Sequence, residues 1–196
     1  MKSPVIARSL VAAAIALASS AQASFHFFDI QEIYSNSAGT VQFIELFTTF
    51  GGQQSLSGHS VTFQLNGVSQ TPLNLSNLPA DTTNKTFLVG TSNLTTLYGV
   101  TPDFVIPANF FTAGANNFIN FAEGTDRVNL TLLPTNGTSS LNGLVNDPGV
   151  TSASTSVNTQ ATPKNFAGQT ATIPEPAGVA LSLMALGAVL VWRRRN

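Results

Sequence analysis

Hydrophobic and polar residues alternate in short runs through the middle of the chain, with the period of β-strands. Residues 41–47 carry apolar side chains on both faces, with Phe43 on one and Ile44 on the other, and predict a central strand. Residues 59–65 alternate cleanly, with Val61, Phe63 and Leu65 facing inward. The same pattern predicts further strands over residues 24–34, 68–75, 86–89, 104–106, 118–121 and 127–133.

Turn residues separate these runs. Gly51-Gly52 ends the strand before it, and Asn66-Gly67 predicts a tight hairpin of the primed type. Pro72 places the returning strand at a sheet edge, because proline cannot donate to a ladder. Residues 92–98 are expected to form one helical turn, and no longer helical period appears between the termini. Many short strands at this spacing indicate an all-β, antiparallel sandwich or barrel.

The N-terminus has the pattern of a secretory signal peptide. Lys2 and Arg8 precede an apolar stretch over residues 10–18, and Ala21-Gln22-Ala23 is an A-x-A cleavage site. Signal peptidase would cut after Ala23. The mature chain would then begin at Ser24, outside the inner membrane.

The C-terminus predicts a transmembrane helix. Residues 177–192 contain no charge and end at Trp192, which suits an interfacial anchor. At about 1.5 Å per residue this helix spans roughly 24 Å, somewhat less than the roughly 30 Å hydrocarbon core of a bilayer. Arg193, Arg194 and Arg195 follow and are expected to stay on the cytoplasmic side, leaving the preceding domain outside.

Pro174-Glu175-Pro176, the apolar helix and the arginine cluster together resemble the PEP-CTERM sorting signal of Gram-negative bacteria. The resemblance implies recognition by an exosortase, a membrane protease, with cleavage near the Pro-Glu-Pro motif. Proteins with this tail are commonly linked to exopolysaccharide and biofilm matrix. The same tail closes some ice-binding proteins.

Composition limits what the exported domain can be. The chain has no cysteine, so no disulfide holds it together. Between Ser24 and Ile173 there are three basic and eight acidic residues, and 3 − 8 gives −5. Sparse, scattered bases argue against nucleic acid as a partner. All 14 phenylalanines lie in this region and are expected to supply the core.

The composition changes along this region. Residues 24–150 are interpreted as the β-domain. Residues 151–173 are interpreted as a Ser/Thr-rich segment and linker, with room for a last strand near Phe166.

A second resemblance covers the domain. Residues 30–36, Ile-Gln-Glu-Ile-Tyr-Ser-Asn, and residues 41–46, Val-Gln-Phe-Ile-Glu-Leu, are similar to the opening strands of lamin-tail-like domains. Pro163-Lys164-Asn165 resembles that family's closing segment, whereas Phe43 stands where the family usually has tryptophan. The resemblance implies an immunoglobulin-like antiparallel β-sandwich that serves as an interaction or structural module.

Candidate chemistry is sparse. The chain has no nucleophile motif, metal-ligand spacing or phosphate-binding glycine loop, and we expect no cofactor. His26 and His59 are far apart, and His59 is expected in a surface turn. Asp126 and Arg127 are expected to form a local surface pair.

Glu32 and Glu45 interrupt apolar strands and are the carboxylates of most interest. They could act in glycoside hydrolysis or bind Ca²⁺. The favoured interpretation is that each binds backbone donors at a sheet rim or faces solvent, with no metal.

The favoured function is a non-enzymatic exported protein of the cell envelope or extracellular matrix. It would be held in the membrane by its tail, sorted by an exosortase to the surface or medium, and in contact with exopolysaccharide. One alternative is a polysaccharide hydrolase that uses Glu32 and Glu45. Another is an ice-binding protein, although threonines such as Thr82-Thr83 and Thr95-Thr96 follow no fixed repeat.

Overall fold

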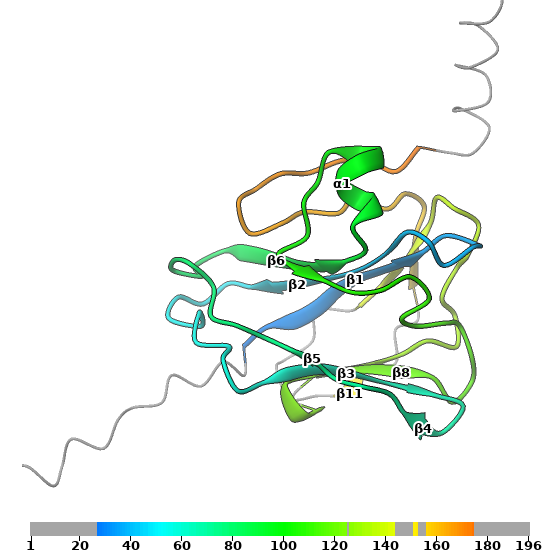
Figure 1. The fold of residues 1–196 in the computed structure, drawn as a ribbon, viewed down its shortest axis with the longest axis horizontal. Coiled ribbons are helices and arrows are strands. Elements are labelled where there is room, and N and C mark those ends of the chain that lie inside the picture. The colour runs from blue at the N-terminus through cyan, green and yellow to red at the C-terminus, as the bar shows by residue number, and fades with distance from the viewer. Residues whose placement is uncertain (1–26, 125, 144–150, 153–155, 175–196) are drawn as a thin grey trace, which may run out of the picture.

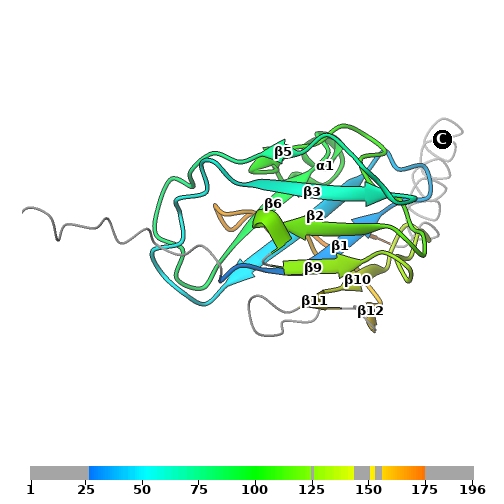
Figure 2. The same cartoon turned by 90° about the horizontal axis from the view of Figure 1, so that it is seen from below.

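The described part of the chain forms two β-sheets and one short α-helix, so the predicted mostly-β architecture is confirmed. The computed structural model describes residues 27–124, 126–143, 151–152 and 156–174. The sheets lie one above the other, with the helix on the far side of the first sheet (Figure 1). The second sheet is seen from below in Figure 2.

The first sheet has six strands in the order β12-β10-β1-β2-β6-β7. Their bounds are β1 Asp29–Ser35, β2 Gln42–Thr48, β6 Lys85–Gly90, β7 Phe104–Val105, β10 Ser140–Asn142 and β12 Ser156–Asn158. The central pair β1–β2 is antiparallel and runs from Asp29↔Phe47 to Ser35↔Gln42. The predicted central strand at residues 41–47 is therefore confirmed.

The second sheet has the order β11-β9-β8-β3-β4, with β5 also paired to β3. Its strands are β3 Ser60–Leu65, β4 Val68–Ser69, β5 Leu73–Asn74, β8 Phe118–Phe121, β9 Asp126–Asn129 and β11 Thr151–Ser152. Asn66 and Gly67 have φ of 51° and 81°, as the primed hairpin turn requires. Pro72 lies between β4 and β5 at the sheet edge, where it was predicted.

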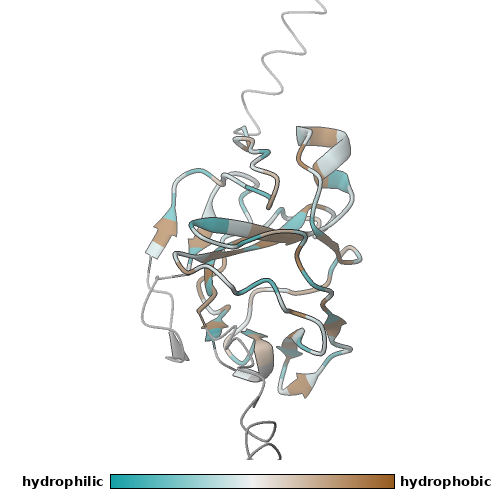
Figure 3. Cartoon of the chain, turned by 90° about the vertical axis from the view of Figure 1, so that its left-hand side faces the viewer, coloured by the Kyte–Doolittle hydropathy of each residue, from teal (hydrophilic) through white to brown (hydrophobic). Residues whose placement is uncertain are grey.

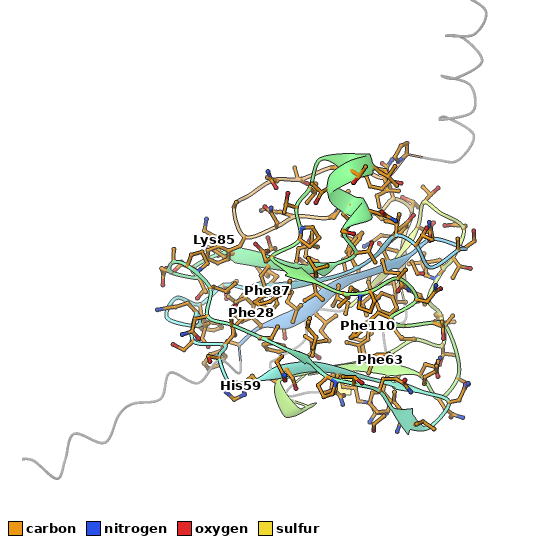
Figure 4. The ribbon with its side chains drawn as sticks, in the orientation of Figure 1. Phe28, His59, Phe63, Lys85, Phe87 and Phe110 are labelled. Carbon is orange, nitrogen blue, oxygen red and sulfur yellow. The ribbon has the colours of Figure 1, made fainter. Side chains whose placement is uncertain are left out.

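Phenylalanine fills the space between the sheets. Phe28 lies directly before β1. Its ring centroid is 4.9 Å from that of Phe87 on β6 and 6.0 Å from that of Phe121 on β8 of the second sheet. Phe63 packs against Phe110 at 4.5 Å. Figure 4 labels Phe28, Phe63, Phe87 and Phe110, whose side chains lie between the layers. Figure 3 shows hydrophobic residues, in brown, and hydrophilic residues, in teal, along the strands that enclose them.

A smaller core lies on the outer face of the first sheet, which faces away from the second sheet. Tyr34, Phe43 and Leu88 of that face are buried against the helix α1, Asn93–Tyr98, and against the end of the described chain. We call residues 159–173 the closing segment. Its Ala161 and Ile173 are both 0% exposed. Figure 1 shows this segment, in orange, on the same side of the sheet as α1.

Two expectations about the strands need correction. The sheets are not wholly antiparallel, because β7 is parallel to β6 and β11 is parallel to β9. The connection from β6 to β7 passes through α1, and a crossover of this kind returns the chain in the same direction. The strand predicted over residues 127–133 ends at Asn129, because the chain then turns and the Leu133 N–H bonds to the Leu130 carbonyl at 3.3 Å.

The segment interpreted as a linker is also part of the fold. Residues 156–158 pair with β10, and residues 151–152 pair with β9. Near Phe166 there is a bridge between Lys164 and Thr170 rather than a strand. Serine and threonine satisfy the ladder through their backbones, so a polar composition did not prevent pairing.

Candidate functional site

Glu32 and Glu45 lie side by side on the outer face of the first sheet. They are directly opposite each other in the β1–β2 register, and the pairing shifts by one residue between Ile30 and Glu32. This bulge keeps Ile30 and Ile33 in the main core while Glu32 points outward. The sequence pattern predicted neither the bulge nor the pairing of the two glutamates.

Both glutamates are buried, so the expectation that they lie at a rim or face solvent is wrong in that respect. Only 4% of Glu32 and 5% of Glu45 is exposed. The expected backbone donors are present, and they come from the closing segment. The Thr162 N–H donates to Glu32 Oε1 at 3.0 Å, and the Lys164 N–H donates to Glu45 Oε2 at 2.7 Å. The pair therefore fastens the closing segment to the sheet.

Glu32 has further hydroxyl donors. The Ser140 hydroxyl on β10 lies 2.5 Å from Glu32 Oε1, and the Thr162 hydroxyl lies 3.3 Å from Oε2. Four separate parts of the chain, β1, β10, β12 and the closing segment, thus meet at one carboxyl group. Charge-assisted hydrogen bonds of this kind are stronger than neutral ones.

Asp103 is a third carboxylate at this site, and the sequence analysis missed it. Its Oδ2 accepts the Leu88 N–H of β6 at 2.8 Å and the Phe166 N–H of the closing segment at 2.9 Å. Its position directly before the predicted strand at residues 104–106 was the only sequence signal for it. Like the two glutamates, Asp103 links the sheet backbone to the closing segment.

Burial changes the protonation of these groups. Desolvation raises the pKa of Glu32, although hydrogen bonds from Ser140 and Thr162 oppose the shift. Desolvation and the charge of Glu32 raise the pKa of Glu45 to about 8, against the Lys164 N–H and the Lys164 charge. The pKa of Asp103 is also raised by burial. At neutral pH the glutamate pair therefore carries less than two full negative charges.

This geometry bears on the two kinds of chemistry expected of the pair. In a glycosidase both carboxyl groups contact the sugar, whereas Glu32 and Glu45 contact the closing segment. Among the described residues, no group of three or more His, Cys, Asp or Glu side chains could hold a metal ion. The pair is arranged to bind backbone and hydroxyl donors.

The remaining candidate residues are distributed as follows. His59 follows a turn in which its N–H bonds to the Leu56 carbonyl at 3.1 Å, so its expected turn position is confirmed. Asp126 and Arg127 are not a surface pair. Asp126 is buried, with Oδ2 2.6 Å from the Ile30 nitrogen. Arg127 lies over the Phe118 ring, 3.5 Å from its centroid.

Most residues of the predicted sorting signal lie outside the described part of the chain. Pro174 is the last described residue and is exposed, directly after the buried Ile173. Glu175, Pro176, Trp192, the three terminal arginines, the signal cleavage residues Ala21 and Ala23, and His26 are not described. No helix within the described ranges has the length and apolar character needed to cross a bilayer.

Comparisons with protein-family models, with curated proteins and with solved structures found no match for this chain.

Proposed function

We propose that this protein is a non-enzymatic, exported component of the cell envelope that is processed at its C-terminus. The observation that carries the proposal is that the Pro-Glu-Pro motif begins directly after a buried, hydrogen-bonded residue. The Ile173 N–H bonds to the Ala161 carbonyl at 2.9 Å, and Ile173 is fully buried. Pro174, the first residue of the Pro-Glu-Pro motif, follows at the surface.

This boundary matches what a C-terminal sorting signal needs. A protease acting at or beyond Pro174 would leave every described hydrogen bond of the domain in place, because the closing segment is already complete at Ile173. The apolar residues 177–192 and the three arginines after them would hold the chain in the membrane until an exosortase acts. The protein would then reach the cell surface or the medium.

The domain is proposed to be an immunoglobulin-like sandwich of the lamin-tail-like kind, serving as a structural or interaction module. Its two-sheet architecture and the central β1–β2 pair, which carries both glutamates, support this assignment. The burial of Glu32 and Glu45, and the backbone N–H groups that donate to Glu32, Glu45 and Asp103, support a structural role for these carboxylates. Exopolysaccharide of the surrounding matrix is the proposed contact.

Fractionation of the native host tests the sorting proposal. We expect the wild-type protein at the surface or in the medium, and we expect a variant with Pro174, Glu175 and Pro176 all changed to alanine to accumulate in the membrane. Deletion of the exosortase should have the same effect. The matched control is Thr172→Ala, an exposed position two residues before the motif, which should distribute like wild type. An unchanged distribution of the triple variant would contradict the proposal.

A further inference from the structure

The fold places Glu32 and Glu45 side by side without a buried cation to balance their negative charge. Directly opposed residues on antiparallel strands have Cβ atoms about 4.5–5.5 Å apart, so two ionised carboxylates at this register repel each other strongly when buried. Glu32 and Glu45 occupy such a register and are almost fully covered. One proton held between them removes that repulsion.

The groups that face the pair supply little compensation. From β10 and β12, Ser140 and Asn158 offer hydrogen bonds to Glu32 but no charge. From β6, the residue opposite Glu45 is the apolar Leu88. From the closing segment, Lys164 is a cation that acts on Glu45, but its side chain is exposed and its charge is screened by solvent.

The charged and titratable groups farther along the same face interact with residues other than Glu32 and Glu45. The Lys85 ammonium lies 5.6 Å from the centroid of the Phe166 ring. Burial raises the pKa of Tyr34, and the nearby Tyr98 of α1 adds to that rise. Asp103 accepts the Leu88 and Phe166 N–H groups. One screened cation therefore faces two buried carboxyl groups.

We propose that Glu32 and Glu45 form a proton-dependent clasp: the closing segment stays on the sheet while the pair keeps a proton, and it is released when that proton is lost. The hydrogen bonds to Thr162 and Lys164 place the clasp directly on the segment that moves. The main core between the sheets is built from residues of both sheets and their connections, and Phe166 is the residue of the closing segment that joins it.

The direction of the pH effect follows from linkage. The pKa of Glu45 is about 8 with the segment closed and returns toward the ordinary 4.5 once the side chain is in water. The closed state therefore binds the proton more tightly than the open state does. Its advantage is complete below pH 4.5 and is lost as pH rises through about 8.

Release would lengthen the connection between the domain and Pro174. About 15 residues at roughly 3.3 Å each could add on the order of 50 Å of reach. The idea that this reach separates the domain from a membrane rests on the proposed function. The clasp itself does not, so failure of the fractionation experiment would leave it standing.

Cleavage by a lysine-specific protease tests the clasp on the full chain in detergent. Cleavage after Lys164 reports opening of the closing segment, and cleavage after Lys85, inside the first sheet, reports global unfolding. The reference is the variant E32Q/E45Q, in which both side chains are permanently neutral. Rates are compared at the same pH, so the protease's own pH dependence cancels.

We expect the wild-type rate at Lys164, relative to the double variant, to rise tenfold or more between pH 5.5 and pH 9, since one pKa unit corresponds to about a tenfold change. The rate at Lys85 should not change with it. The control variant D81N changes an exposed acid, and its relative cleavage rate at Lys164 should depend on pH as that of the wild type does. A ratio independent of pH, or equal acceleration at Lys85, would overturn the clasp. If E32Q/E45Q fails to fold, E45Q alone serves as the reference under the same criteria.

Discussion

At the scale of single residues, buried polar side chains join parts of this domain that are distant in sequence. Gln42 is 0% exposed, and its amide group is fully used. The Nε2 group donates to Ser35 Oγ and to the Phe111 carbonyl, and Oε1 accepts the Phe110 N–H at 2.7 Å. One side chain on β2 thus holds the loop before β8 against the first sheet.

Gln42→Leu should therefore be strongly destabilising. An unpaired buried polar group costs about 1–3 kcal/mol, so with several left unpaired we expect unfolding free energy to fall by about 3 kcal/mol. Urea denaturation measures the change. The matched control is Gln64→Leu, because Gln64 is half-buried and donates only within its own turn, to the Gly67 carbonyl. We expect less than about 0.5 kcal/mol there. Similar losses in the two variants would argue against the role assigned to Gln42.

At the scale of elements, the closing segment completes the outer face of the first sheet. It is not regular secondary structure, yet Phe166 and Ile173 are buried and three of its N–H groups bind carboxylates. It shares this role with α1, which buries Leu94 against the same sheet. Without the segment, Glu32 and Glu45 would lose the backbone donors of Thr162 and Lys164.

Ending the chain after Asn158 should consequently cost far more than ending it after Pro174. Burying a large apolar side chain contributes about 1.5–3 kcal/mol, so loss of Phe166 and Ile173 alone removes roughly 3–6 kcal/mol. We expect the Tm to fall by about 10 °C or more. The chain ending after Pro174 should keep the full-length Tm in the same detergent. Equal melting of the two truncated chains would show that the segment does not stabilise the domain.

At the scale of the whole molecule, the acidic residues give the domain an unusual pH response. Burial raises the pKa of Glu32, Glu45, Asp103 and Asp126, so each binds a proton more readily in the folded state. Asp81 has the opposite shift, to about 2, because Thr83 and Gly52 donate hydrogen bonds to it. Four groups therefore favour the fold at lower pH, and one favours it at higher pH.

We expect the Tm to be highest near pH 4 and to decline toward pH 9. The four raised pKa values stabilise the fold below the unfolded values of 3.8 and 4.5, and this stabilisation is lost as pH rises through the folded values. The Asp81 contribution is lost only as pH falls from 3.8 through about 2. Calorimetry from pH 4 to pH 9 measures the trend. A Tm that is flat or rising between pH 6 and pH 9 would contradict the raised pKa values.

The sequence by itself determined the strands that bury alternating apolar side chains. Residues 41–47 and 59–65, the Asn66-Gly67 turn and the edge position of Pro72 followed from local rules, because side-chain period and backbone preference are properties of neighbouring residues. The short helix over residues 93–98 followed in the same way.

Only the tertiary structure decided the rest. The three polar strands β10, β11 and β12 pair through their backbones, which a hydrophobic pattern does not detect. The bulge that turns Glu32 outward and the meeting of Glu32, Glu45 and Asp103 with the closing segment join residues up to 130 positions apart. Whether a glutamate faces water or lies buried beneath another part of the chain depends on what packs over it, and local sequence does not carry that information.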